Sequence, residues 1–282
     1  MRATQQLTAR CVRGVARCYT ARAQAAEPPA RHHSTRFLTG ATPALRLALL
    51  VLNVDCESLY TDSVLSRLWQ DAAVRLCADG AANRLYDSLP EAERGRMLPD
   101  QIRGDLDSLR PDVAEFYRAR GVRIEHEPEQ DTHDFEKCLR WLEEEQRSAS
   151  EPFTVVAFGA FGGRLDQTMA NLNMVYRYTS FASFILLSAD SLALLLPPGR
   201  NVIHVNDELE SGSCGLVPLG GRCERIVTSG LLWDLDGSRP LEFGALVSSS
   251  NEVTGSEVSV ETSAPLLWTS NCRAREEGGR FE

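Results

Sequence analysis

Six aspartates stand at junctions between predicted strands, loops and helices. They occur in the stretches CADGAANRLYD, RGDLDSL, EQDTHDF and GGRLDQ, and they are Asp79, Asp105, Asp107, Asp131, Asp134 and Asp166. In open α/β sheets, ligands bind beyond the carboxyl ends of the strands, so we expect these side chains to share one crevice. They would repel one another unless a cation lay among them, and ligand sets made only of oxygen suit Mg²⁺. Mg²⁺ usually binds phosphate oxygens as well, so a nucleoside triphosphate is the expected co-ligand.

A glycine-rich stretch precedes the last of these aspartates. Gly159, Gly162 and Gly163 lead into Arg164 and a predicted helix. Backbone N–H groups in such a loop can bind phosphate at a helix N-terminus, and an arginine can add a bidentate contact. The same glycines could instead form only a tight turn, and Asp107 could simply cap a helix. Each stretch taken alone therefore leaves a purely structural role open.

Two other classes of phosphate-handling enzyme are disfavoured by the sequence. A P-loop kinase needs G-x-x-x-x-G-K-[ST], which is absent, and the single lysine of the chain, Lys137, falls inside a predicted helix. A haloacid-dehalogenase-like phosphatase carries Asp-x-Asp directly after a buried apolar strand. Residues 99–104, which precede Asp105, do not have the pattern of such a strand.

Alternating strands and helices are predicted to position these residues as far as about residue 190. Apolar runs predict strands at 45–53, 76–78, 121–125, 153–158, 184–187 and 192–196. Helical spacing predicts helices at 63–76, 111–120, 134–146 and 166–178. This alternation indicates an α/β fold with a parallel sheet.

The pattern changes after Pro197-Pro198-Gly199. Short β-rich runs then recur at close spacing, at 201–205, 214–219, 225–228, 245–249 and 257–261. Runs of this kind, separated by Gly and Asx residues, predict a smaller all-β domain. The tail from residue 273 is charged and glycine-rich, and we expect it to be flexible.

The charge is unevenly distributed along the 282 residues, which carry a formal net charge of −9. Residues 1–36 hold seven arginines and one acid, so the remainder has 23 basic and 38 acidic residues, a net charge of −15. The leader therefore has the composition either of a mitochondrial transit peptide or of a disordered extension. The acidic remainder lacks the basic face that nucleic-acid binding needs. No apolar run reaches the ~18 residues of a membrane span, and the eight cysteines show no metal-like spacing.

Taken in order, seven stretches resemble the thiamin pyrophosphokinase family, with the animal enzymes as the nearest pattern. They are CADGAANRLYD (77–87), GDLDS (104–108), EQDTHDFEKCL (129–139), GGRLDQTMAN (162–171), SGLLWDL (229–235), LVSSSN (246–251) and VSVETSAPLLWT (258–269). The resemblance covers about residues 46–270. It implies transfer of the diphosphoryl group of ATP to the hydroxyl of thiamin, which gives thiamin diphosphate and AMP. It also implies a homodimer with active sites at the subunit interface, and no nucleic-acid or membrane partner.

The resemblance also implies a domain order and a location. A leader (1–38) would precede an ATP- and Mg²⁺-binding α/β domain (39–198), a thiamin-binding β-sandwich (199–272) and the tail (273–282). Location would be cytoplasmic by resemblance, or the mitochondrial matrix if the leader is a transit peptide.

Site roles follow from the same resemblance. Mg²⁺ would bind Asp79, Asp105, Asp107 and Asp134, and the catalytic set would be Asp105, Asp107, Asp134 and Asp166. ATP and its phosphates would contact Asp79, Asn83, Gln130, Thr132, Arg164 and Gln167. Thiamin would contact Ser248, Ser250, Asn251 and Trp268. The resemblance does not decide whether Asp107 or Asp166 takes the hydroxyl proton.

Three positions depart from the family pattern. Ala81 stands where a second glycine is usual, Leu106 replaces a phenylalanine, and His133 separates Thr132 from Asp134. Ala81 is tolerable unless that position needs a positive φ. The departures at Ala81 and His133 leave an alternative open, a catalytically inactive thiamin- or nucleotide-binding protein of the same fold.

Overall fold

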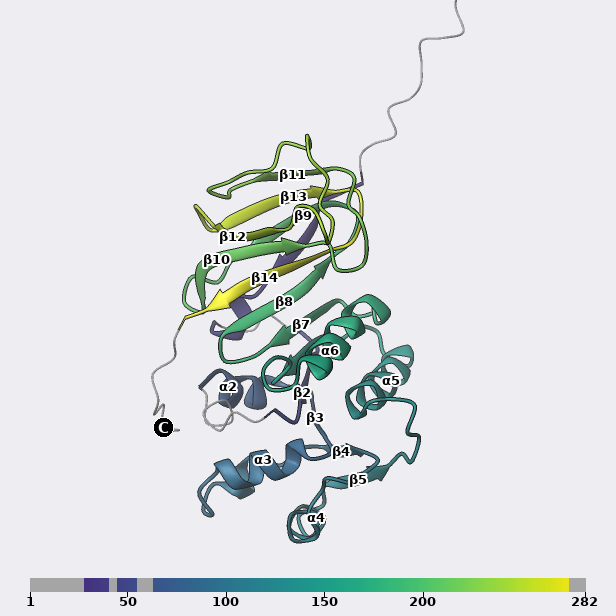
Figure 1. Cartoon of the computed structure of the whole chain (residues 1–282). Coiled ribbons are helices and arrows are strands. Elements are labelled where there is room, and N and C mark those ends of the chain that lie inside the picture. Colours follow the sequence, from purple (N-terminus) through teal and green to yellow (C-terminus); the bar gives the residue numbers. More distant parts are fainter. Residues whose placement is uncertain (1–27, 41–44, 55–62, 274–282) are drawn as a thin grey trace, which may run out of the picture.

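Two β-sheets organise the chain (Figure 1). The computed structural model describes residues 28–40, 45–54 and 63–273. The larger sheet has ten strands, in the spatial order β12 (Ser248–Glu252), β10 (Glu210–Val217), β14 (Leu266–Cys272), β8 (Ser191–Leu196), β7 (Ser183–Leu187), β6 (Thr154–Phe158), β2 (Leu47–Val51), β3 (Val74–Ala78), β4 (Gln101–Gly104) and β5 (Arg123–His126). The smaller sheet has the order β1 (Arg31–Ser34), β9 (Gly199–His204), β13 (Glu257–Thr262) and β11 (Ile226–Ser229).

Six neighbouring strands of the large sheet, from β7 to β5, are parallel. Every residue of β2 and of β6 is buried, because both faces of a parallel sheet are covered. From β8 onward the neighbours are antiparallel, and β13 alternates exposed and buried residues along its length. The expected fold class, a parallel α/β part followed by a mostly β part, is confirmed.

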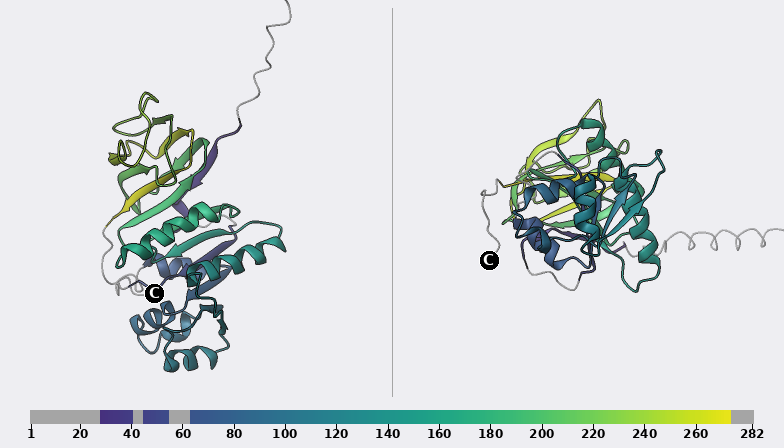
Figure 2. Two further views of the ribbon diagram at one scale, coloured as in Figure 1. Left: turned by 45° about the vertical axis from the view of Figure 1, so that its right-hand side comes forward. Right: turned by 90° about the horizontal axis from the view of Figure 1, so that it is seen from below.

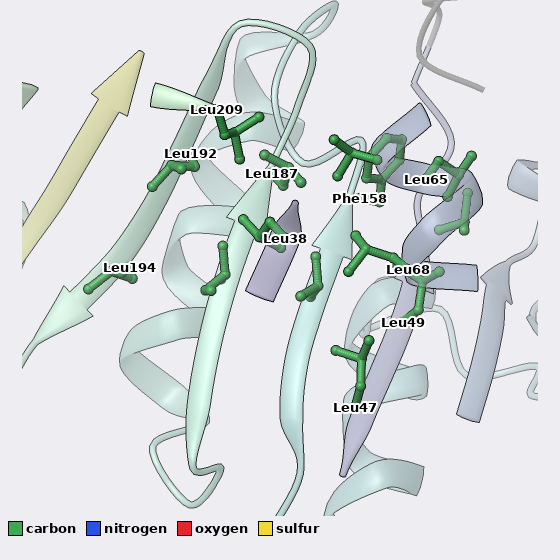
Figure 3. Packing of buried hydrophobic residues seen from close by; sticks show 14 of the residues in the cluster. Leu38, Leu47, Leu49, Leu65, Leu68, Phe158, Leu187, Leu192, Leu194 and Leu209 are labelled. Atoms are coloured by element: carbon green, nitrogen blue, oxygen red, sulfur yellow. The ribbon is translucent and has the colours of Figure 1, made fainter. Parts of the chain in front are cut away.

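Helices cover the two faces of the parallel part unequally. One face packs against α2 (Ser63–Asp71), α3 (Ala81–Ser88) and α4 (Pro111–Arg118), and the core on this side continues into the smaller sheet. The other face packs against α5 (Asp134–Arg147) and α6 (Leu165–Arg177). Figure 3 shows the first of these cores, where Leu68 of α2 lies beside Leu49 of β2 and Leu65 of α2 lies on the side of Phe158 of β6.

The N-terminal segment belongs to the folded part. Residues 31–38, which composition assigned to the leader, form β1 and the 3₁₀ helix η1 (Arg36–Leu38). β1 runs parallel to β9, far from it in sequence, as Figure 2 shows. Phe37 and Leu38 are buried in the core, and Thr35 donates a hydrogen bond to the buried carboxylate of Glu210. Residues 31–38 therefore belong to the fold rather than to a separate leader.

Two predicted elements differ from the structure. The helix expected over 63–76 ends at Asp71 and is followed by β3, because a buried strand continues the apolar pattern of the helix before it. The strand β4 directly precedes Asp105, although residues 99–104 do not have the apolar pattern that predicts a buried strand. Its polar members are accommodated, since Gln101 is buried and Arg103 pairs with Glu127.

The predicted boundary near residue 198 falls between β8 and β9, but the large sheet does not stop there. β14 of the C-terminal half pairs with β8 over six residues, and β10 and β12 extend the same sheet. The two halves therefore share a continuous hydrogen-bonded sheet.

Candidate active site

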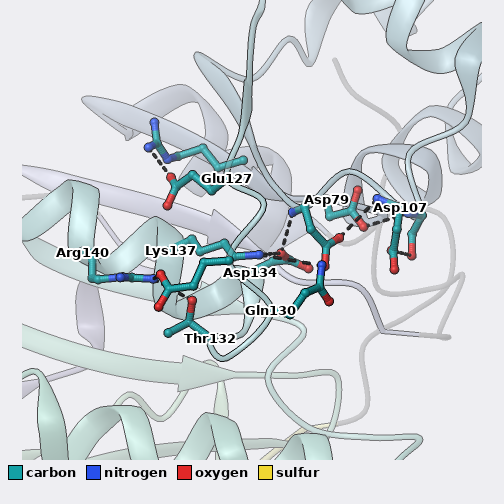
Figure 4. A network of polar contacts seen from close by, with 12 residues as sticks. Asp79, Asp107, Glu127, Gln130, Thr132, Asp134, Lys137 and Arg140 are labelled. Atoms are coloured by element: carbon teal, nitrogen blue, oxygen red, sulfur yellow. Dashed lines mark hydrogen bonds and ion pairs between the residues drawn. The ribbon is translucent and has the colours of Figure 1, made fainter.

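Three of the six expected aspartates form a tight group. Asp79 follows β3, Asp105 follows β4, and Asp134 begins α5, so adjacent parallel strands bring the first two to one edge of the sheet. Each of the three offers a carboxylate oxygen, and these oxygens all lie within 4.8 Å of one another. Figure 4 shows the group among its polar neighbours.

Gly104 makes this close approach possible. A Cβ atom at this position would lie 2.8 Å from Asp134 Oδ1 and 2.8 Å from Asp79 Cβ. Contacts under 3.0 Å are essentially never seen for a real Cβ atom. Any side chain at residue 104 would therefore push the carboxylates apart.

Backbone and side-chain hydrogen bonds fix the orientation of the carboxylates. Asp134 Oδ1 accepts from the backbone N–H of Asp105 at 3.1 Å and from Lys137 Nζ at 3.0 Å. Asp105 accepts from the backbone N–H of Asp107 and from Gln130 Nε2, each at 3.2 Å. These bonds direct the carboxylates of Asp105 and Asp134 toward one another.

The backbone around the group is strained. Asp79 has a φ of 41° and Leu106 a φ of 60°, in the left-handed region that non-glycine residues seldom adopt. Such strain persists only where the surroundings enforce it, and it clusters at functional sites. Leu106, which replaces the phenylalanine of the family pattern, has this left-handed conformation between Asp105 and Asp107. The backbone at Leu106 therefore sets the course of the loop that carries the two aspartates.

Asp79 is left with an unsatisfied oxygen. Its Oδ2 accepts from the backbone N–H of Ser108 at 3.1 Å, but Oδ1 is buried without a hydrogen-bond partner. Burial is the main reason why the pKa of Asp79 is raised to about 6; the charges of Asp134 and Asp107 act in the same direction, whereas hydrogen bonds from Ser108 act against it. A buried carboxylate oxygen without a donor, beside two more carboxylates, suits a hard divalent cation such as Mg²⁺. The residues present therefore fit the expected metal.

A pocket with a volume of about 240 Å³ opens beside the acidic group. It lies between the N-termini of α5 and α6, whose unpaired N–H groups favour anions. Five of the predicted residues line it, namely Asp105, Gln130, Thr132, Asp134 and Gln167. The glycine-rich loop contributes Gly159 and Gly162, whose φ values of 85° and 110° lie in the left-handed region that favours glycine.

Other predicted residues lie at the margin of this pocket or outside it. Asp107 is exposed and accepts from Ser108 Oγ at 2.9 Å, and Asp131 is exposed as well. Arg164 and Asp166 pair with each other on the surface, with side chains 72% and 63% exposed, and neither lines the pocket. Asn83 braces the loop after Asp107, because it donates to Ser108 O and accepts from Arg110 N.

The predicted thiamin residues separate into two groups. Ser248, Ser250 and Asn251 lie on β12, and Ser250 is exposed with a φ of 57°. Trp268 of β14 is wholly buried in the core, and its role as a thiamin contact stays a prediction. Trp233, in the stretch SGLLWDL, is by contrast 60% exposed. The backbone of Trp233 is held in place by hydrogen bonds to the Asn251 side chain at 2.9 and 3.2 Å.

Sequence reasoning missed several residues of the site. Asn53, His133, Thr168 and Asn171 line the pocket, and Lys137 contacts the acidic group. Two patterns in the sequence could have indicated these residues. Asn53 is the first polar residue after a continuous apolar run, and Thr168 and Asn171 are three residues apart and so share a face of α6. At Ala81, which begins α3, the backbone does not have a positive φ, so the missing second glycine leaves the fold undisturbed.

The fold and the site together define a class of protein. An α/β sheet presents grouped aspartates and an anion-favouring pocket at its carboxyl edge, and a β-rich part extends the same sheet, as in a nucleotide-handling enzyme with a second ligand-binding part. Comparison with known families is more specific. Residues 65–186 match the model described as the catalytic domain of thiamin pyrophosphokinase, and residues 200–267 match its vitamin B1 binding domain. The chain therefore belongs to the thiamin pyrophosphokinase family.

Individual relatives agree with this assignment. Thiamine pyrophosphokinase 1 of Arabidopsis thaliana is 41% identical over 251 residues, which cover 84% of this chain and 91% of the relative. Thiamin pyrophosphokinase 1 of Caenorhabditis elegans is 33% identical over 205 residues, which cover 72% and 80%. Of these two the plant protein is the more similar.

Solved structures show the same fold. Yeast thiamin pyrophosphokinase superposes with a TM-score of 0.75 at 24% identity, over 88% of this chain and 93% of that one. The Candida albicans protein gives 0.74 at 24% identity, over 88% and 95%. The predicted family and the predicted enzyme class, thiamin diphosphokinase, are confirmed, and the inactive alternative is not supported. No helix within the described ranges is long and apolar enough to cross a membrane.

Proposed function

We propose that this site transfers the diphosphoryl group of ATP to thiamin with the aid of Mg²⁺. The thiamin hydroxyl oxygen attacks the β-phosphorus of ATP. The bond between the β-phosphorus and the α,β-bridging oxygen breaks, and AMP leaves with that oxygen. The observation that carries the proposal is the three-aspartate group with its unsatisfied Asp79 Oδ1, beside a pocket that favours anions. When bound to this group, Mg²⁺ neutralises charge on the triphosphate.

The side chains of the pocket hold the triphosphate in place. Gln130 and Gln167 line the pocket and can donate to phosphate oxygens, while the N-termini of α5 and α6 direct backbone N–H groups toward it. Thr132 accepts a hydrogen bond from Arg140 Nη2 at 2.6 Å, and its hydroxyl also bonds the Glu129 carboxylate, so a phosphate at this position replaces Glu129 as the acceptor. Positioning of this kind is the main catalytic device in phosphoryl transfer.

A carboxylate must take the proton that the thiamin hydroxyl loses. The Arg164 guanidinium holds the pKa of Asp166 below its usual value, which makes Asp166 a poor proton acceptor. Asp107 carries no such partner in the described structure, and its backbone N–H is bonded to Asp105 of the acidic group. We assign the proton to Asp107.

An assay of the nucleotide product tests the reaction. The full chain, incubated with ATP, thiamin and Mg²⁺, should release AMP and thiamin diphosphate in equal amounts. Omitting thiamin or Mg²⁺ should stop AMP release. ADP as the product, or AMP release without thiamin, would contradict the proposal, and tight thiamin binding without AMP would restore the inactive alternative.

We propose further that the chain works as a homodimer with its active sites at the subunit interface. Exposed large apolar side chains occur in two places, Leu165 and Met169 on α6 and Leu232, Trp233 and Phe243 in the β-rich half. Single exposed apolar residues are ordinary, but pairs beside a site are typical of interfaces. In this arrangement Trp233 of one subunit would stack on the cationic thiamin bound beside α6 of the other.

Mixing two impaired variants at low thiamin tests the dimer. Asp105→Asn disables the acidic group and Trp233→Ala removes the ring, so a mixed dimer retains one intact site only if the two residues act across the interface. At a thiamin concentration well below the raised KM of Trp233→Ala, the co-refolded variants should recover part of the wild-type activity, whereas neither variant alone should. No recovery, or a monomer in light scattering, would refute this arrangement.

The location is proposed to depend on the residues before β1. The first strand of the described residues, β1, begins at Arg31, so removal of a transit peptide before this residue leaves that strand in place. A fusion of residues 1–30 to a fluorescent protein should enter mitochondria if the leader is a transit peptide. A diffuse signal would support the cytoplasm instead.

A further inference from the structure

The chain contains 30 basic residues, and all but one of them are arginine. The exception is Lys137, on the second turn of α5. Its side chain is completely buried, whereas lysine is among the residues least often buried in proteins. A buried charge is costly unless it is paired, so this lysine must have specific partners.

The partners of Lys137 are two members of the acidic group. Its Nζ lies 3.0 Å from Asp134 Oδ1 and 4.0 Å from Asp105 Oδ2. Asp134 is one helical turn before Lys137, so α5 fixes the spacing between them. Figure 4 shows the lysine chain pointing at Asp134 from the side of α5.

Arginine could not make the same contacts. A guanidinium is a broad planar fork, whereas an ammonium is a compact point charge with three donors. Elsewhere this chain pairs its acids with arginine at the surface, as in Arg110 with Asp87 and Arg140 with Glu129. A lysine occurs only at the fully enclosed position behind the aspartates.

We infer that Lys137 is a positioning residue that acts as a fixed cation within the metal-binding group. Its single charge offsets one of the three carboxylates, which leaves a net charge of −2 for one divalent ion. It also holds Asp134 Oδ1, so that the other oxygen of this carboxylate remains available. The inference rests on the proposed Mg²⁺ role of Asp79, Asp105 and Asp134.

The single lysine allows a direct test without mutation. Protein grown with isotope-labelled lysine gives one lysine side-chain signal in an NMR spectrum. Addition of Mg²⁺ should shift this signal with saturation at one equivalent, and Mn²⁺ should broaden it. If calorimetry shows that Mg²⁺ binds but the lysine signal stays unchanged, the inference about Lys137 is wrong. If no Mg²⁺ binds at all, the proposed metal role itself has failed.

Substitutions give a second readout. In Lys137→Met the carboxylates lose their internal cation, so Mn²⁺ should bind about tenfold tighter or more, and should raise the melting temperature more than in the wild type. Turnover should fall, because Asp134 is no longer held. Lys137→Arg keeps the charge, so its response to Mn²⁺ should stay nearer to that of the wild type.

Arg177→Met is the matched control. Arg177 forms two hydrogen bonds of 2.7 Å with the buried Glu136 on α5, away from the acidic group. Its loss should lower the melting temperature equally with and without Mn²⁺. The same metal-independent loss in Lys137→Met would reduce Lys137 to a structural role and overturn the inference.

Discussion

Replacement of Asp79 by asparagine should stabilise the metal-free protein at neutral pH while it abolishes catalysis. The side chain of Asp79 is buried, one of its oxygens has no partner, and burial raises its pKa to about 6. In the unfolded chain its pKa would be close to 4. Between about pH 4 and pH 6 the folded protein therefore binds more protons than the unfolded chain, so stability falls as the pH rises through this window.

The size of this effect follows from the two pKa values. A difference of about two units corresponds to about 3 kcal/mol, which the metal-free wild type loses between about pH 4 and pH 7 through Asp79 alone. Asparagine resembles the neutral acid and carries no such cost. Metal-free Asp79→Asn should therefore be more stable than the wild type at pH 7.5, by about 1–3 kcal/mol, or roughly 5 °C in melting temperature.

Thermal unfolding at pH 4.5 and pH 7.5, with and without Mg²⁺, measures this directly. Mg²⁺ should stabilise the wild type at pH 7.5, because it binds the folded state, but should stabilise Asp79→Asn little. Asp107→Asn is the control, since this exposed carboxylate lies outside the tight group and should change stability by less than about 0.5 kcal/mol. The reasoning about Asp79 would be refuted if metal-free Asp79→Asn were less stable than the wild type at pH 7.5. It would also be refuted if the stability of this variant fell between pH 4.5 and pH 7.5 as steeply as that of the wild type.

Four further outcomes are expected. Asp105→Asn should reduce thiamin-dependent AMP formation by about 10²–10³ or more with an unchanged circular dichroism spectrum; substantial activity would exclude a metal role. Gly104→Ala should cost about 1–3 kcal/mol and weaken Mn²⁺ binding measured by electron paramagnetic resonance, because its Cβ has no room. Trp268→Ala should lower the free energy of unfolding in urea by about 3–5 kcal/mol, whereas Trp233→Ala, at an exposed position, should mainly raise KM for thiamin. The reverse pattern would show that Trp268 binds thiamin and Trp233 stabilises the fold. Deletion to residue 40 should destabilise the protein by several kcal/mol more than deletion to residue 30, since Phe37 and Leu38 are buried.

The parallel half of the fold was largely predictable from sequence. Buried strands such as β2 and β6 consist of continuous apolar residues, and α5 and α6 show clear helical spacing. β4 was missed because a four-residue strand can carry a buried Gln101 and a paired Arg103, which local patterns score as polar. The leader boundary was missed because Arg31 and Arg36 count as basic in composition although they belong to folded elements.

The site was predictable as a set of stretches but not as a geometry. Sequence order shows that aspartates follow strands, yet only the adjacency of β3 and β4 decides that Asp79 and Asp105 meet. The same patterns could not tell that Arg164 would capture Asp166, since that pairing depends on side-chain conformation. Nor could they tell Trp233 from Trp268, because the two differ in burial and not in residue type.

The shared sheet has a consequence for synthesis of the chain. β8 ends at Leu196, but its partner β14 begins at Leu266, about seventy residues later. β1 likewise pairs with a strand, β9, that is synthesised much later than β1 itself. A ribosome adds residues from the N-terminus onward, so the edge of β8 stays open until the end of the chain has emerged. An uncovered strand edge is a template for association with other chains. Chains truncated shortly before residue 266 should therefore aggregate rather than remain as stable catalytic fragments. The unpaired edge of β8 is the part of the nascent chain that most needs to be covered by a chaperone.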